Sequence, residues 1–318
     1  MSDERTLDLL EAKIEELRSL NREDGIDLSG EIARLEKKLE GMRRELYSNL
    51  SDWERVRFAR HPKRPYALDY IGAVFSDFYE LHGDRIVGDD PALLTGLARL
   101  DDRPVVILGQ QKGRSTEENQ LRFFGMTRPH GYRKARRALL LAERFSFPVI
   151  TLIDTPGAYP GVEAEELNVG CAIAENLLTM SALRTPIVSL VIGEGGSGGA
   201  LAIGVADRVL MLENAIYSVI SPEAAASIVW RDKERMKDAA VALNLTAPHL
   251  AELGLIDTVI DEPLGGAHRD FQATTENVRS ELLRHVEELA ELPVNELVAA
   301  RYERYRNVGR FRTITDGD

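Results

Sequence analysis

Apolar residues recur at steps of three and four in the first part of the chain. One series runs from Leu7 to Leu17, and a second runs from Leu28 to Leu46. This spacing gathers apolar side chains on one face of a helix. The polar stretch NREDGID, which separates the two series, favours a turn. We therefore predict a helical hairpin over residues 1–50 that packs against itself or a partner subunit, as an assembly arm without catalytic residues.

The middle of the chain repeats one pattern. Three apolar, β-branched runs each begin at a proline and end in a glycine or DTPG turn, and each has the character of a buried strand. They are PVVILG at 104–109, PVITLID at 148–154 and PIVSLVIG at 186–193. Helical patterns at 131–145 and around 174–184 separate them, and a fourth strand is expected at 207–219. This alternation predicts a parallel α/β fold with helices covering the sheet.

The flanking segments have less regular patterns. Residues 71–85 have a helical pattern, and residues 88–104 are expected to form a loop that leads into a hairpin. The stretch from 276 to 306 predicts amphipathic helices broken near Pro293, and the last residues, 313–318, are expected to be frayed.

Charge narrows the classes of partner. The 40 basic and 52 acidic side chains give a net charge of −12, which argues against broad binding to nucleic acid or to an anionic membrane. The N-terminus is charged, and no apolar stretch approaches the roughly 20 residues needed to cross a bilayer. We therefore expect a cytoplasmic protein. Because Cys171 is the single cysteine and the six histidines are dispersed, we expect no metal site built from this chain alone.

Two glycine-rich turns follow predicted strands: DTPGAYPG at 154–161 and GEGGSGG at 193–199. The second fits the dinucleotide pattern G-x-G-x-x-G, but the helix after it spans only about two turns, too short for a dinucleotide crossover. The first resembles a GTPase motif, but the phosphate-binding sequence G-x-x-x-x-G-K-[ST] is absent from the chain. We therefore exclude a GTPase and disfavour a nucleotide cofactor.

Both turns can present free backbone N–H groups, which stabilise negative charge that develops on an oxygen. One such turn would be explained as a tight connection, but two on consecutive parallel strands favour a functional site. Asp154 is expected to cap amides of its own turn, and Glu194 to order its loop without transferring a proton. A basic cluster, Arg128 to Arg137, is either a solvated helix face or a contact for coenzyme A phosphates or an acidic partner, for which Arg133 and Lys134 are the candidates.

Seven segments lie in order along the chain from about His61 to Arg269. They are HPKRPYALDYI, GQQKGR, FGMTRPHGYRKA, FPVITLIDTPGAYPGVEAEE, VIGEGGSGGALAIGVADRVLMLENAIYSVISPEAAASIVW, TAPHL and PLGGAHR. Together they resemble a known family, the carboxyltransferase alpha subunit of multisubunit acetyl-CoA carboxylase. The chain departs from the family pattern at residues 167–170.

The resemblance implies a crotonase/ClpP-like spiral of β-β-α units over residues 51–318, after the helical hairpin and with helices at the C-terminal end. It implies an active site shared between two alpha and two beta subunits, which passes a carboxyl group from carboxybiotin on a biotin carboxyl carrier protein to acetyl-CoA. The product is malonyl-CoA, in the first committed step of fatty-acid synthesis. ATP is used by the separate biotin carboxylase component, and a structural zinc is expected in the beta subunit.

Carried over to this sequence, the resemblance assigns the backbone N–H groups of Gly198 and Gly199 to the oxyanion site, where they hold the ureido oxygen of biotin. The cleft beside them is lined by Gly157, Ala158, Gly195 and Gly196. Two other functions remain open from the residues alone. One is a stand-alone crotonase-like acyl-CoA hydratase or thioesterase, with Glu194 as its catalytic carboxylate. The other is a scaffold without catalytic activity for a beta-type partner.

Overall fold

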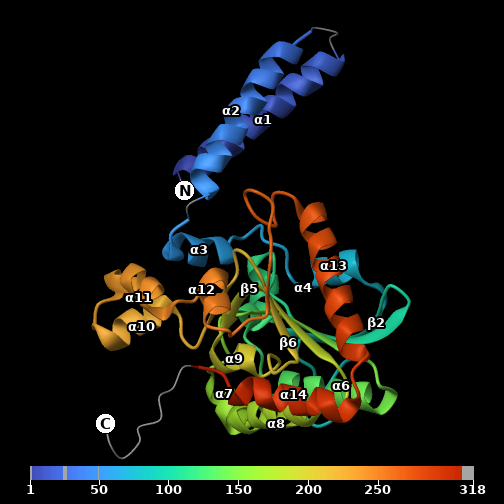
Figure 1. Ribbon diagram of the computed structural model, residues 1–318. Coiled ribbons are helices and arrows are strands. Elements are labelled where there is room, and N and C mark those ends of the chain that lie inside the picture. The colour runs from blue at the N-terminus through green and yellow to red at the C-terminus, as the bar shows by residue number, and fades with distance from the viewer. Residues whose placement is uncertain (1, 24–26, 49, 310–318) are drawn as a thin grey trace, which may run out of the picture.

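The computed structural model describes residues 2–23, 27–48 and 50–309. The N-terminal helices α1 (Ser2–Glu23) and α2 (Ser29–Tyr47) lie side by side and stand out from the rest of the chain (Figure 1). Leu7, Ile14 and Leu39 are buried between them, so the apolar series pack as predicted. The Nη1 atom of Arg269 lies 2.6 Å from Oε2 of Glu11 and joins the hairpin to the body.

The body is built on one mixed sheet with the order β1-β2-β3-β4-β5-β6-β8, and β7 pairs with the end of β5. The pairs β1–β2 and β2–β3 are antiparallel, and the other pairs are parallel. The strands are β1 (Ser76–Glu80), β2 (Leu93–Leu100), β3 (Arg103–Gln110), β4 (Val149–Thr155), β5 (Ile187–Gly196), β6 (Arg208–Leu212), β7 (Ile216–Ser218) and β8 (Thr258–Ile260).

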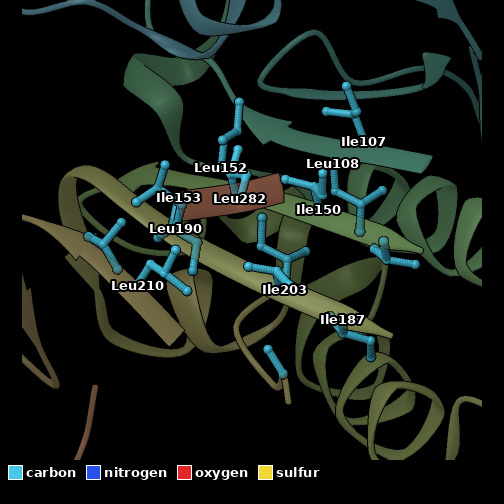
Figure 2. Packing of buried hydrophobic residues seen from close by; sticks show 14 of the residues in the cluster. Ile107, Leu108, Ile150, Leu152, Ile153, Ile187, Leu190, Ile203, Leu210 and Leu282 are labelled. Atoms are coloured by element: carbon cyan, nitrogen blue, oxygen red, sulfur yellow. The ribbon is translucent and has the colours of Figure 1, made fainter. Parts of the chain in front are cut away.

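Helices cover both faces of this sheet, which explains why its central strands are apolar throughout. α4 (Ala67–Val74) and α13 (Phe271–Ala290) lie over one face, and α6 (Pro129–Phe145) and α8 (Val169–Ala182) lie over the other (Figure 1). Figure 2 shows the resulting core, in which Leu282 of α13 packs beside Leu152 of β4, while Ile203 lies near Ile187 of β5.

Shorter helices connect these elements, and α10 and α11 form a small lobe beside the sheet (Figure 1). The remaining helices are α3 (Asp52–Ala59), α5 (Thr116–Leu121), η1 (Phe123–Gly125), α7 (Val162–Glu166), α9 (Ser197–Leu201), α10 (Pro222–Val229), η2 (Lys233–Arg235), α11 (Met236–Leu243), α12 (Ala247–Glu252) and α14 (Val294–Arg306). Among the described helices, none has both the length and the apolar character that a membrane crossing requires.

Three predicted elements differ from the structure. The helix expected over 71–85 is wrong, because α4 ends at Val74 and β1 follows. The ring of Phe78 in β1 lies directly over Gly96 of β2, where a Cβ atom would be 2.5 Å from the ring, so strand pairing overrides the local helical pattern. The strand expected over 207–219 is divided into β6 and β7 by a turn, and β7 pairs with the glycine-rich end of β5.

The strands predicted at 104–109, 148–154 and 186–193 and the break near Pro293 are confirmed. The loop expected over 88–104 is wrong over Leu93–Leu100, which form β2 and pair with β3 as one arm of a hairpin. Residues 313–318, for which fraying was expected, lie outside the described residues. The last helix, α14, is held to the body by Arg301. Its buried guanidinium lies 2.7 Å and 2.8 Å from the two carboxylate oxygens of Asp207 and donates to three backbone carbonyl groups.

Candidate active site

The two glycine-rich turns lie side by side at the carboxyl edge of the sheet. β4 leads into the turn at 156–161, and β5 leads into α9. The two strands are parallel neighbours, with Thr155 opposite Gly195. Because parallel strands end at the same edge, residues far apart in the sequence meet there, at the place where α/β proteins usually bind ligands.

The turns touch backbone to backbone. A Cβ atom on Gly199 would lie 2.3 Å from the carbonyl carbon of Gly157 and 2.5 Å from the amide nitrogen of Ala158. A Cβ atom on Gly196 would lie 2.2 Å from the carbonyl oxygen of Pro156. Glycine is therefore required at both positions for the turns to approach so closely. The structure brings together four of the six predicted glycine-turn residues: Gly157, Ala158, Gly196 and Gly199.

The other two predicted glycines have different surroundings. Gly195 faces β7, since a Cβ atom there would lie 2.7 Å from the ring of Tyr217. Gly198 is half-buried, and a Cβ atom on it would meet only the side chain of Ile173, at 3.8 Å. Gly198 is thus the most open of the glycines at the start of α9, whereas Gly199 is buried.

The start of α9 has an unusual backbone. Ser197, its first residue, has a φ angle of 53°, a left-handed conformation that L-residues seldom adopt. The first amides of an α-helix have no carbonyl acceptor within the helix. The amides of Gly198 and Gly199 belong to this first turn, so an oxygen placed beside it could accept hydrogen bonds from both.

A cavity of about 390 Å³ opens beside Gly198. It is walled mainly by apolar side chains from α9, β7, α12 and α14, so it suits an apolar portion of a substrate or partner rather than a charged one. The residues around it are Ser197, Gly198, Leu201, Gly204, Val209, Tyr217, Ser218, Val219, Leu250, Leu255, Arg304, Tyr305 and Val308.

A cluster of buried charges lies against the same strand ends. The Nζ atom of Lys112 lies 2.8 Å from Oδ1 of Asp154 and 3.0 Å from Oε1 of Glu194. The second carboxylate oxygen of Glu194 accepts from Nε of Arg60 at 2.8 Å, and Nη1 of Arg60 also pairs with Glu223 of α10 at 2.7 Å. The cluster thus connects β3, β4, β5, α3 and α10.

These contacts set the ionisation of the cluster. Burial acts to lower the pKa of Lys112, but Asp154 and Glu194 outweigh it and raise that pKa above its usual value. Burial acts to raise the pKa of Glu194, but Lys112 and Arg60 outweigh it and lower that pKa. Glu194 is therefore a carboxylate with a cation on each oxygen, and it is poorly suited to accept a proton.

The interpretation of Asp154 requires correction. Its Oδ1 atom accepts from the amide of Glu194 on the neighbouring strand at 3.0 Å and from Lys112, so the prediction that it caps its own turn is wrong. The cap within that turn comes from the next residue, Thr155. Its hydroxyl accepts from the amide of Gly157 at 3.2 Å and donates to the carbonyl of Gly125 at 2.7 Å.

The two basic candidates on α6 are occupied internally. The ammonium of Lys134 has no exposed surface and pairs with Asp89 at 2.6 Å, so the expectation that it contacts coenzyme A or a partner is wrong. Arg133 is 18% exposed, and its Nε atom donates to Asp84 at 2.9 Å. Arg133 and Lys134 are therefore not the solvated surface that was the alternative either, because Asp84, which is buried, and Asp89, which is exposed, pair with them. A contact from Arg133 stays a prediction.

The sequence reasoning did not single out Lys112, Arg60 or Gln110 as site residues. Lys112 is 42 positions from Asp154 and 82 from Glu194 in the sequence, so no local spacing reveals the cluster. The available indication was Lys112 itself, a lysine two residues after the end of the apolar strand β3. Within the described residues, no group of three His, Cys, Asp or Glu side chains converges in a way that could hold a metal ion.

Comparison with known proteins agrees with this arrangement. Residues 1–309 match the family described as acetyl co-enzyme A carboxylase carboxyltransferase-like. The acetyl-coenzyme A carboxylase carboxyl transferase subunit alpha of Methylococcus capsulatus is 55% identical over 302 residues, which cover 95% of this chain and 94% of the relative. The protein of the same name from Fusobacterium nucleatum is 53% identical over 98% of this chain and 99% of its own.

Solved structures confirm the predicted crotonase-like fold. A Pseudomonas malonate decarboxylase hetero-tetramer in complex with coenzyme A aligns with a TM-score of 0.57 and 21% identity, covering 69% of this chain and 89% of that one. Transcarboxylase 12S aligns with a TM-score of 0.56 and 22% identity over 80% of this chain and 44% of that one. With a family match over nearly the whole length and relatives more than half identical, the chain belongs to the family of acetyl-coenzyme A carboxylase carboxyl transferase alpha subunits.

Proposed function

We propose that the chain is the alpha subunit of an acetyl-CoA carboxylase carboxyltransferase, which transfers a carboxyl group from carboxybiotin on its carrier protein to acetyl-CoA and so forms malonyl-CoA. Membership of the family supports the reaction. The observation that carries the proposal is the backbone contact between the turns at Gly157 and Gly199, next to the first-turn amides of α9. That contact forms a site from peptide groups, without side chains that would obstruct a substrate.

The proposed role of this chain is to hold an oxygen that becomes negative during transfer. Carboxybiotin supplies the carboxyl group when it is bound. The amides of Gly198 and Gly199 would donate to its ureido oxygen. Such preorganised donors stabilise negative charge that develops on an oxygen, and they act most strongly in a water-poor site. The absence of a Cβ atom at Gly196 and Gly199 lets the backbone of Pro156 to Ala158 lie directly against the start of α9.

The same geometry argues against a stand-alone hydratase or thioesterase. Such an enzyme would use Glu194 as a general acid or base. Both oxygens of Glu194 are bound by cations, and its pKa is lowered. We therefore propose that Glu194 does not remove the proton of the acetyl methyl group, and that the biotin group would supply the base when it is bound.

The proposed assembly contains a beta subunit, which would hold the thioester oxygen of acetyl-CoA and carry the zinc, in an arrangement of two alpha and two beta chains in the cytoplasm. ATP would be used by the separate biotin carboxylase. Exposed apolar side chains support a partner on this part of the molecule. Val219 at the rim of the cavity is 77% exposed, and Ile228 and Val229 of α10 are 71% and 65% exposed. Apolar side chains that gather on a surface commonly mark protein interfaces.

We also propose that residues 1–50 act as the assembly arm. The hairpin buries its own apolar stripe and meets the body mainly through the pair Arg269–Glu11 and the rings of Tyr47 and Phe58, whose centroids are 5.5 Å apart. A double substitution, Ile14→Asp with Leu39→Asp, should disrupt the hairpin. The arm role predicts a smaller complex by light scattering from the alpha and beta chains together, with an unchanged melting transition of the body.

The reaction is tested by mixing the purified chain with a beta chain of the same family, carboxylated carrier protein and acetyl-CoA, and measuring malonyl-CoA. Formation only in the mixture supports the proposal. Hydration or thioester hydrolysis by this chain alone would support the alternative enzyme. The Gly199→Val variant should break the contact between the turns. If the mixture that contains this variant still forms malonyl-CoA at the full rate, the turns take no part in the reaction, and this chain has only a scaffolding role.

A further inference from the structure

Three consecutive side chains at the end of β3 reach three different elements around the glycine turns. They belong to Gln110, Gln111 and Lys112, in the segment GQQKGR. β3 does not pair with β5, because β4 lies between them. Side chains from β3 therefore cross over the end of β4 to reach the turn after β5.

Gln110 joins both turns with one amide group. Its Nε2 atom donates to the carbonyl oxygen of Gly199 at 2.8 Å, and its Oε1 atom accepts from the backbone amide of Asp154 at 3.2 Å. The side chain is fully buried. Glutamine suits this position because its amide carries a donor and an acceptor, whereas a carboxylate could not donate and an apolar side chain could do neither.

Lys112 joins the same strand ends by charge. Its ammonium lies between Asp154 and Glu194, and Oδ1 of Asp154 also receives the amide of Glu194. Without this cation two buried carboxylates would repel one another across the ends of β4 and β5. Gly125 makes room for the lysine stem, since a Cβ atom at Gly125 would lie 2.9 Å from Cγ of Lys112.

Gln111 fixes the backbone that carries these two residues. Its Oε1 atom accepts from the amide of Leu68 at the start of α4, and its Nε2 atom donates to the carbonyl of Lys112, each at 2.8 Å. The segment 110–112 is therefore bound to α4 as well as to the glycine turns. This second attachment fixes the backbone from which Gln110 and Lys112 extend.

We propose that Gln110 and Lys112 are positioning residues of the oxyanion site, which hold the turn of Gly198 and Gly199 against the turn of Gly157. This inference rests on the proposed function for its catalytic consequence. Gln110 acts through the carbonyl of Gly199, and Lys112 acts through Asp154 and Glu194. Neither residue is required to touch a substrate.

The test uses Gln110→Met and Lys112→Met in the assembly with the beta chain. A displaced oxyanion donor typically reduces kcat by about 100-fold, so we expect a reduction of roughly 10- to 100-fold while KM for acetyl-CoA changes less than about threefold. The matched control is Lys134→Met, which also removes a buried lysine from an ion pair, but with Asp89 on a different loop. Its kcat should stay within about twofold of the unsubstituted protein.

A second measurement separates positioning from the reaction itself. Amide hydrogen exchange over residues 195–204 should be faster in Gln110→Met than in the unsubstituted chain and unchanged in Lys134→Met, because local opening raises exchange. If the unsubstituted assembly makes no malonyl-CoA, the proposed function fails, and exchange still tests the positioning role. Exchange equal to that of the unsubstituted chain in Gln110→Met, or a kcat within about twofold of it, overturns the inference. If Lys112→Met does not fold, the kcat and the amide exchange of Gln110→Met alone test the positioning role.

Discussion

Gly199 and Gly157 approach so closely that a Cβ atom on Gly199 would lie 2.3 Å from the carbonyl carbon of Gly157. Gly157 lies in the turn after β4 and Gly199 lies in α9 after β5, so the contact joins the two segments beside the proposed oxyanion site. A single methyl group is therefore a sharp probe of the site, because it changes this distance without changing charge.

Gly199→Ala is expected to force the two turns apart. Since overpacking of a closed backbone contact costs about 1–3 kcal/mol, the unfolding free energy should fall by that amount. The reaction should suffer more, with a reduction in kcat of about 100-fold, because the amides at the start of α9 move away from the oxygen they are proposed to bind. Malonyl-CoA formation and thermal melting measure the two effects.

The matched control is Gly72→Ala in α4, where no heavy atom lies within 4 Å of the added methyl group. Gly72 is exposed in a helix, so alanine there should leave kcat unchanged and raise stability by up to about 1 kcal/mol. A Gly199→Ala protein with the kcat of the unsubstituted chain would show that the contact between the turns does not shape the site.

Glu194→Gln separates a structural carboxylate from a catalytic one. Glutamine keeps an oxygen that can accept from Lys112 or Arg60, so we expect kcat to fall by less than about tenfold in the complete assembly. A general acid or base would lose about a hundredfold or more in this variant. A pH profile of kcat supplies the second readout. The lowered pKa of Glu194 implies that its removal eliminates no ionisation near neutral pH.

The sequence predicted the strands and turns of the site because their signals are local. A run such as PIVSLVIG is apolar and β-branched over consecutive positions, and the glycines follow directly. The edge strand β1 was missed because its five residues carry too little alternation to outweigh a helical pattern. Its conformation depends on pairing with β2, which the sequence of 71–85 does not record.

The contacts of the charged side chains around the site could not be predicted from local sequence, for a different reason. Asp154 was expected to accept hydrogen bonds from amides of its own turn, as aspartates in turns commonly do. Instead, its Oδ1 atom accepts from Lys112, which follows β3, and from the backbone amide of Glu194 in β5. Likewise, the basic residues of α6 appeared to form a surface cluster, but Asp84 and Asp89 from the loop before β2 cover two of them. Both outcomes depend on which loops the fold brings together.

Arg301→Met should be among the most damaging substitutions outside the site. The Arg301 side chain is 1% exposed, and its loss leaves the carboxylate of Asp207 buried without its cation. Breaking one partner of a buried ion pair costs about 3–5 kcal/mol, which denaturant unfolding would record. The double variant Arg301→Met with Asp207→Asn should recover part of this loss, because no unpaired charge remains.

Arg284→Met is the corresponding surface control. Arg284 also pairs with two carboxylates, Glu281 and Glu288, but its side chain is 47% exposed. Exposed pairs contribute about 0–1 kcal/mol, so the unfolding free energy should barely change. Equal losses from the two arginine variants would contradict the role assigned to Arg301 in holding α14.

The stability of the protein should fall in mildly acidic solution because of His268. Its ring stacks on His61 with centroids 4.1 Å apart, and neither of its ring nitrogens has a hydrogen-bond partner among the described residues. Burial, together with His61 and Arg269, lowers the pKa of His268 to about 3. Between that value and the ordinary histidine pKa of about 6.5, the unfolded chain binds a proton at this residue and the folded chain does not. Folding is therefore opposed progressively as the pH falls through this range.

We expect the unfolding free energy to decrease by about 1–2 kcal/mol more between pH 7 and pH 5 in the unsubstituted protein than in His268→Phe, which keeps an aromatic ring and cannot titrate. Thermal melting at the two pH values measures the difference. Since a buried neutral imidazole makes folding weaker in acid, an identical pH dependence in the His268→Phe and unsubstituted proteins would mean that the ring of His268 takes up its proton in the folded state.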